Sequence, residues 1–202
     1  MSDGRGVAHS LAEVYLYLMV TPCARCGKGP LQGGDARPEC WGDTPGVTVD
    51  TRCAACGDQS RVCFEVPGED LAASRNAPPD TVARVNSTGQ RSQIIDVGGW
   101  MTLFGVIADA AARATDKAEA RRLGYEAAQC LDEALKFYEP ENELPPDSAF
   151  FDEASRRRYR DHPERLARSR LIGLRARLPS IDAMEKRLLS EKKRKRWWQW
   201  RS

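Results

Sequence analysis

Cys23-Ala-Arg-Cys26-Gly27 and Cys53-Ala-Ala-Cys56-Gly57 are the two stretches that decide how the N-terminal part of this chain is expected to fold. Each places two thiols in one tight turn, and the glycine after the second cysteine permits the positive φ with which the backbone curls around a sulfur. Two such turns complete a tetrahedron of sulfurs around one metal ion. Because tetrahedral thiolate sets favour zinc, we expect one structural zinc ion bound by all four cysteines.

A closed set of four thiolates leaves no open position for water, so the expected metal is structural rather than catalytic. Metal binding of this kind contributes on the order of 10 kcal/mol or more, which offsets the cost of ordering a glycine-rich segment. An iron ion with the same ligands and redox-active thiols are the alternatives. The 26 residues between the pairs exceed the usual spacing of about 15 to 20. An inserted loop is therefore expected, and residues 27–46, with six glycines and three prolines, are predicted to form it.

The three remaining cysteines have less distinctive surroundings. Cys63 falls in a predicted strand and is expected to be a small core residue, and Cys130 falls in a predicted helix and is expected to be packed. Cys40 precedes Trp41 in the predicted loop, where it is either a spare thiol or a substitute ligand. The sequence leaves open whether Cys40 or Cys63 contacts the metal.

The four ligands, the two glycines and the strand expected after the second knuckle resemble the zinc-ribbon class, over roughly residues 12–68. This resemblance implies an interaction or nucleic-acid-binding module rather than an enzyme, and it selects no partner. Residues 92–180 resemble a helical domain of an uncharacterised bacterial protein, and that resemblance implies no particular activity.

The N-terminal part is predicted to be rich in β-structure. Val47–Arg52 and Gln59–Val66 carry β-branched or alternating residues and are predicted strands. Val14–Val20 is assigned to a strand entering the first knuckle. A short helix is the alternative for this run, because Ser10 and Glu13 match a capping box.

The apolar period changes to that of helices after Trp100. We predict helices over Met101–Ala114, from Asp116 to Tyr138, from Asp147 to about Arg160, over Leu166–Leu178 and from Ile181 to about Lys193. Before them, residues 93–97 are predicted to be a strand or an extended lead-in, and Gly98-Gly99 is predicted to be a turn.

The expected fold class is therefore α+β: a small β-rich zinc ribbon, then a mainly α-helical domain, then a disordered basic tail. The expected boundaries are 1–70 for the ribbon-like domain, 71–91 for a linker, 92–190 for the helical domain and 191–202 for the tail. Because a ribbon alone buries little apolar surface, the helices are expected to pack against it.

Charge is distributed unevenly along the chain. Residues 1–155 contain 14 Lys or Arg and 24 Asp or Glu, whereas residues 156–202 contain 17 and 5. Nine arginines lie between Arg156 and Arg177. They either pair with the acidic body or form a basic stripe that follows a phosphate backbone. The asymmetry indicates an anionic partner or internal charge pairing.

The end of the chain combines five consecutive cations with three tryptophans. These residues are Lys192, Lys193, Arg194, Lys195, Arg196, Trp197, Trp198 and Trp200. Because like charges repel, the tail is predicted to be disordered. It is a solvated tail, a nucleic-acid-binding segment with tryptophans stacked on bases, a weak anchor on an anionic membrane surface, or a docking peptide for a protein.

No catalytic constellation is visible. His9 and His162 lie far apart and outside any metal or triad motif, and no nucleophile elbow, P-loop or dinucleotide fingerprint is present. The sequence shows no secretory signal and no apolar run of about 20 residues, so a cytoplasmic protein is expected.

These features together favour a non-enzymatic zinc-binding adaptor that binds nucleic acid through its basic C-terminal region, with no small-molecule substrate. Two alternatives remain. The first is a protein–protein interaction or regulatory module with purely structural zinc. The second is peripheral membrane association through the Lys/Arg/Trp tail.

Overall fold

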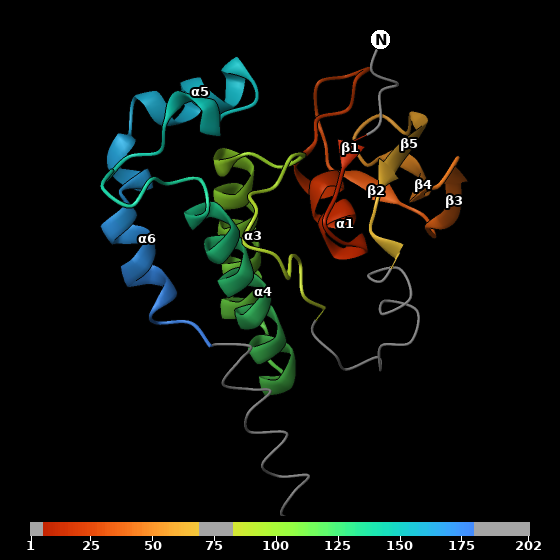
Figure 1. Ribbon diagram of the computed structural model, residues 1–202. Coiled ribbons are helices and arrows are strands. Elements are labelled where there is room, and N and C mark those ends of the chain that lie inside the picture. Colours follow the sequence, from red (N-terminus) through yellow and green to blue (C-terminus); the bar gives the residue numbers. More distant parts are fainter. Residues whose placement is uncertain (1–5, 69–82, 180–202) are drawn as a thin grey trace, which may run out of the picture.

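The computed structural model describes residues 6–68 and 83–179, and it is a mixed α+β structure with a small sheet and, within these ranges, five α-helices. Figure 1 shows the sheet on one side, helix α1 next to it, and the longer helices α3 and α4 beyond α1. The tail at 191–202, the helix expected from Ile181 and residues 71–82 of the expected linker lie outside the described residues.

The sheet is organised around its longest strand, β4 (Thr44–Cys53). On one side β4 pairs along its length with β5 (Gln59–Glu65), which also carries the short parallel strand β1 (Gly6–Val7). On the other side β4 pairs with β3 (Arg37–Trp41) near its start and with β2 (Leu31–Gly33) near its end. The strands predicted over 47–52 and 59–66 are confirmed. The loop predicted over 27–46 was wrong in part, because β2, β3 and the start of β4 lie in it.

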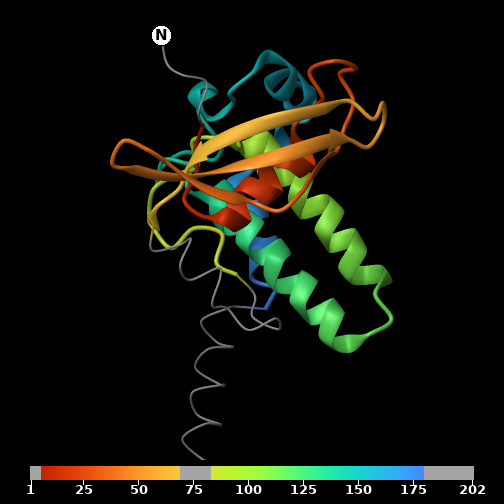
Figure 2. The ribbon, with the colours of Figure 1, turned by 90° about the vertical axis from the view of Figure 1, so that its right-hand side faces the viewer.

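Helix α1 (Leu11–Val20) replaces the strand that was assigned to Val14–Val20, and the helical alternative is confirmed. Ser10 caps this helix, and its hydroxyl accepts a hydrogen bond from the Glu13 backbone N–H at 3.1 Å. Figure 2 shows α1 lying beneath the strands.

Two apolar cores meet at α1, one on each side. On the sheet side, α1 shares a core whose fully buried members are Ala8, Val14, Leu18, Val47, Val49, Phe64 and Val66. On its opposite side, α1 packs against the helical core through Ala12, Leu16, Tyr17 and Val20. A helix between two layers is apolar all round, and this explains why its sequence lacks the one-sided period of a surface helix. The helices that follow the sheet in the chain therefore pack against the N-terminal part through α1, rather than against the strands themselves.

Helices α3 (Val97–Arg113) and α4 (Lys117–Leu135) form a hairpin around the helical core. Their far end extends beyond the sheet (Figure 2). Asp116 caps α4 by accepting from the backbone N–H groups of Ala118 and Glu119. Among the described residues, no helix is long and apolar enough to span a bilayer.

The start of α3 differs from the prediction. Gly98 and Gly99 lie in the first turn of the helix rather than in a turn before it, and residues 93–97 form no strand. Asp96 caps α3 by accepting from the Gly99 N–H at 2.7 Å, and its second oxygen accepts from the Phe151 N–H at 3.1 Å. A Cβ at Gly98 would overlap the Ser155 hydroxyl, so glycine lets a later helix pack closely at this point.

The remaining described chain consists of short helices that cover α3 and α4. They are the 3₁₀ helix η1 (Asp147–Ala149), α5 (Glu153–Arg160), the 3₁₀ helix η2 (Pro163–Leu166) and α6 (Arg168–Arg175). The single helix predicted from Asp147 to Arg160 is therefore two, with Asp152 capping the second through the Ser155 N–H. The helix predicted over Leu166–Leu178 begins at Arg168 and ends at Arg175.

Buried hydrogen bonds hold residues 83–86, which precede α3, against α4 and the start of α1. The Val85 N–H donates to the Gln129 side chain of α4 at 2.8 Å, and the Ser10 hydroxyl donates to the Val85 carbonyl at 2.6 Å. Asn86 donates to Glu133, which is 3% exposed. Because buried polar groups need partners, these bonds fix where residues 83–86 lie.

Candidate metal centre

The four expected ligands come from two turns that the sheet places side by side. Cys23 and Cys26 lie between α1 and β2, whereas Cys53 ends β4 and Cys56 lies in the turn to β5. In the β2–β4 ladder Leu31 pairs with Cys53, and the Ala54 N–H donates to the Pro30 carbonyl at 3.0 Å. The short strand β2, which sequence reasoning missed, therefore holds the first turn against the second.

The two turns have the same backbone structure. In the first, the Cys23 N–H donates to the Lys28 carbonyl, and the Gly27 N–H donates back to the Cys23 carbonyl at 2.8 Å. In the second, the Cys53 N–H donates to the backbone carbonyl of Asp58 at 2.8 Å, and the Gly57 N–H donates to the Cys53 carbonyl at 2.9 Å.

The glycine that ends each of these turns has the backbone angle expected of it. Gly27 has φ +67° and Gly57 has φ +75°, in the left-handed region that favours glycine. The role predicted for these two glycines is confirmed.

The four sulfurs converge on one point. All four lie within 4.8 Å of one another, with 3.8 Å between the Cys23 and Cys56 sulfurs and 3.7 Å between those of Cys26 and Cys53. A tetrahedron with metal–sulfur bonds of about 2.3 Å has edges of about 3.8 Å. The cluster therefore has the dimensions needed to hold one metal ion, and all four cysteines are free of disulfides.

Two thiols of the cluster are shifted in opposite directions. The Cys56 backbone N–H, and after it that of Ala55, lower the pKa of Cys53 to about 7 against the effect of burial. The Asp58 backbone N–H acts in the same way on Cys56, but burial and the neighbouring thiols outweigh it and raise the pKa of Cys56 to about 12. Cys23 and Cys53 are buried, Cys26 is half-buried and Cys56 is exposed. The Cys56 side of the cluster is therefore the side nearest to solvent.

An ion pair joins the two turns outside the sulfurs. The Arg25 guanidinium, from within the first turn, donates to the Asp58 carboxylate of the second at 3.3 Å. Arg25 is 70% exposed, so this contact stabilises the site by only a few tenths of a kcal/mol. The contact links the two turns directly, side chain to side chain.

The other cysteines lie away from this centre. Cys40 is exposed on β3, and Cys63 is half-buried on β5, where its sulfur lies 3.6 Å from the Thr48 hydroxyl. Neither belongs to the sulfur cluster. Cys130 is fully buried in the helical core, as predicted, and burial raises its pKa well above the ordinary thiol value.

The two histidines also stand apart from the sulfur cluster. His9 is buried and contacts Glu13, with 3.2 Å between its Nδ1 and the carboxylate, whereas His162 is exposed beside Glu164. Within the described ranges, the four cysteines form the one group of three or more metal-binding side chains close enough to share an ion.

Comparison of the chain with protein-family models, with curated proteins and with solved structures finds no match.

Proposed function

We propose that this protein is a non-enzymatic adaptor, in which one zinc ion stabilises the sheet and the basic C-terminal region binds nucleic acid. The cysteine geometry supports the first half. Four sulfurs at the spacing of a tetrahedral thiolate site fill every coordination position, which is the arrangement of a structural metal. Zinc is the proposed ion because it prefers such a set and brings no redox chemistry.

The second half is supported by how few of the C-terminal arginines pair with acids. Glu153 lies 3.0 Å from Arg156 and 3.1 Å from Arg160, and Asp132 lies 2.7 Å from Arg175. The other arginines between 156 and 177 make no ion pair with any described residue, and most of them are exposed. The exposed ones are Arg157, Arg158, Arg165, Arg170 and Arg177.

Several guanidinium groups from α5, η2 and α6 therefore face solvent without a carboxylate partner in the described chain. Guanidinium groups bind phosphate in a fixed two-pronged geometry, and each phosphate contact adds to a salt-dependent affinity. The cations from Lys192 to Arg196 would add further phosphate contacts, and the three tryptophans that follow them would stack on unpaired bases.

The test is binding of single- and double-stranded nucleic acid across a salt series. Four proteins are compared: the full chain, a version ending at Ser190, a triple variant Arg157→Gln/Arg165→Gln/Arg170→Gln, and a control triple variant Arg113→Gln/Lys117→Gln/Arg121→Gln. The control removes the same charge from exposed positions on the α3–α4 hairpin.

We expect the truncation and the first triple variant to weaken binding and to reduce the salt slope, by about one unit for each lost phosphate contact. The control is expected to bind almost as the full chain does. Absence of binding by the full chain at moderate salt would refute the nucleic-acid half and leave the metal site untouched. Equal losses in the two triple variants would show that net charge, rather than this surface, attracts the nucleic acid.

A further inference from the structure

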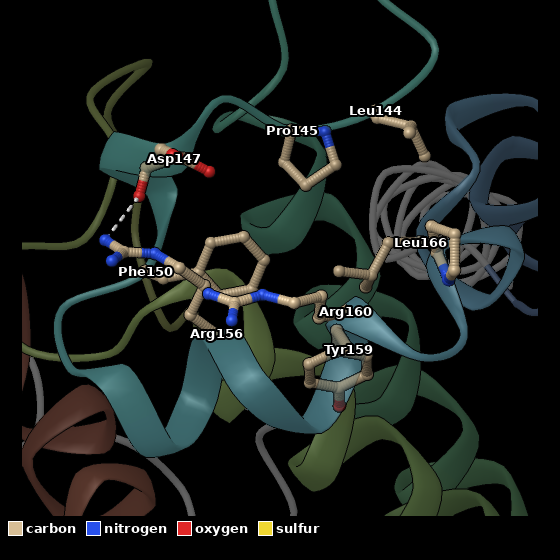
Figure 3. A pocket seen from close by; sticks show the side chains of 9 residues that line it. Leu144, Pro145, Asp147, Phe150, Arg156, Tyr159, Arg160 and Leu166 are labelled. Carbon is tan, nitrogen blue, oxygen red and sulfur yellow. Dashed lines mark hydrogen bonds between the residues drawn. The ribbon is translucent and has the colours of Figure 1, made fainter.

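A pocket of about 350 Å³ lies between the segment that follows α4, helix α5 and helix η2 (Figure 3). This volume lies in the range of small-molecule sites. The side chains that line it are Leu144, Pro145, Asp147, Phe150, Arg156, Tyr159, Arg160, Pro163 and Leu166.

One part of the pocket lining consists of apolar side chains with little freedom to move. Leu166 is 2% exposed, and the Phe150 ring, half-buried, packs near Tyr159 with 6.4 Å between the ring centroids. Pro145 and Pro163 have few rotatable bonds. Figure 3 shows the Tyr159 hydroxyl turned away from the pocket, and it donates to the Gly98 carbonyl at 3.2 Å. This part of the lining therefore offers a flat apolar surface rather than hydrogen-bonding groups.

The charged side chains are concentrated on α5. Arg156 and Arg160 are one helical turn apart, and both pair with the single carboxylate of Glu153. One negative charge therefore faces two positive charges. Each guanidinium has five N–H donors, and the bonds to Glu153 and to the Asp147 carbonyl use only a few of them.

Arg156 carries a further sign that a partner is missing. Its Nε is buried and has no hydrogen-bond partner among the described residues. Buried donors are almost always paired, and the guanidinium is a group that pairs with planar, two-oxygen acceptors. Because protein atoms cover Nε, a ligand in the pocket would be bound by the terminal nitrogens of this guanidinium.

Asp147, the acidic residue that lines the pocket, limits the charge that a ligand can carry. The Asp147 carboxylate lies on the opposite wall from Arg160 (Figure 3), and no ion pair to it is formed within the described chain. It repels a second negative charge, so a ligand with one charge fits better than a phosphate or a dicarboxylate.

We infer that this pocket binds a small organic monocarboxylate with a flat apolar body. Its carboxylate would accept from Arg156 and Arg160, and its body would lie against Phe150 and the two prolines. Arg157, Arg165 and Arg170, which carry the proposed nucleic-acid surface, do not line the pocket, so the two sites are independent.

The test uses the full chain labelled with ¹⁵N, with benzoate as the probe and benzamide as its neutral counterpart of the same shape. Amide shifts are followed by NMR for wild type and for Arg156→Gln, Arg160→Gln, Asp147→Asn and the control Arg157→Gln. Arg157 is exposed and follows Arg156 on the same helix, so its replacement by Gln removes the same charge without changing the pocket lining.

We expect benzoate to shift the amides around Phe150 and Arg156, and benzamide to bind at least tenfold more weakly. Each arginine variant should weaken benzoate binding about tenfold, the loss expected when a charged hydrogen bond is removed. Asp147→Asn should tighten it a few-fold, and Arg157→Gln should leave it unchanged. If Arg156→Gln fails to fold, Arg160→Gln still decides, because that side chain is 61% exposed.

Three results would overturn the inference. The first is a lack of benzoate-dependent shifts at millimolar concentration. The second is equal binding of benzoate and benzamide, which would make the pocket a nonspecific apolar site. The third is a loss in Arg157→Gln as large as that in Arg160→Gln, which would reduce the effect to overall charge.

Discussion

The sulfurs of Cys26 and Cys53 lie 3.7 Å apart although 27 positions separate them in the chain. This is close to the edge of a tetrahedral zinc–thiolate site and far from a disulfide bond of about 2.05 Å. The sheet register fixes the relationship, because Cys53 pairs with Leu31 just after the first turn. The register of the sheet therefore brings the two pairs of ligands together.

Replacing one cluster cysteine should remove the metal. We expect Cys56→Ser to lower bound zinc from about one ion per chain to a small fraction and to lower the melting temperature, because the site loses a thiolate and its folding energy. Elemental analysis and thermal denaturation measure the two effects. Cys40→Ser is the matched control, since Cys40 is exposed and lies outside the cluster. Full metal content in Cys56→Ser would disprove the four-cysteine assignment.

Because Gly57 has a positive φ, replacing it with alanine should destabilise the protein more than the same change at Gly89. Gly57→Ala should destabilise the zinc-bound protein by about 1–2 kcal/mol, because an L-residue at φ +75° is strained. Gly89→Ala, in open surroundings at an ordinary φ, should change stability little. Chemical denaturation of both variants in excess zinc gives the comparison, and similar stabilities for the two would argue against the turn geometry.

Two glycines of α3 should respond with opposite signs. Gly98→Ala would overlap the Ser155 hydroxyl and lie 2.9 Å from the Tyr159 ring, so we expect a loss of about 1–3 kcal/mol. Gly105→Ala meets open space, and alanine in a helix is favoured over glycine by about 0.5–1 kcal/mol. Urea denaturation separates the two. A stabilised Gly98→Ala variant would mean that α5 does not pack on α3 as described.

Burial raises the pKa of Glu133, although hydrogen bonds from Lys136 and Asn86 act in the opposite direction. A carboxyl with a raised folded-state pKa contributes stability below its unfolded value, about 4.3, and this contribution is lost as the pH rises through the folded-state value. Glu133→Gln should therefore flatten the fall in melting temperature from pH 4 towards neutrality. Glu141→Gln, at an exposed position, is the control.

The outcome at neutral pH decides between two roles for Glu133. If Glu133→Gln equals or exceeds the wild-type stability there, the ionised carboxylate is a burden on the fold. If the variant loses stability at neutral pH and not at pH 4, the pair with Lys136, 2.6 Å apart, stabilises the protein instead, and the prediction fails.

The sequence predicted elements that carry one clear period, and it missed those whose pattern depends on distant packing. β4, β5, α3 and α4 were found, with small errors at their ends. Strand β3 contains Pro38, and among the described strands it pairs with β4 alone, which is the edge position that tolerates proline. Strand β2 contains Gly33, where a Cβ would lie 2.7 Å from Leu18, so packing rather than propensity requires that glycine.

In the candidate site too, local features could be predicted from the sequence, and contacts between distant segments could not. The spacing of the cysteines and the glycines after them is local, and it identified the ligand set and the turn shape. The pair between Arg25 and Asp58 joins positions 33 apart and could not be inferred from either turn alone. The pocket lined by Arg156 and Phe150 likewise depends on how α5 packs against the segment that follows α4.

Helix α1 has a consequence for how this protein can be divided. Leu18 belongs to the core on the sheet side while Leu16 packs against the helical core, so the same ten residues complete both cores. A fragment cut after the metal-binding sheet would leave Ala12, Leu16, Tyr17 and Val20 in contact with water. The two cysteine turns therefore cannot be moved into another protein without the helical core, because α1, which precedes them, packs against both cores.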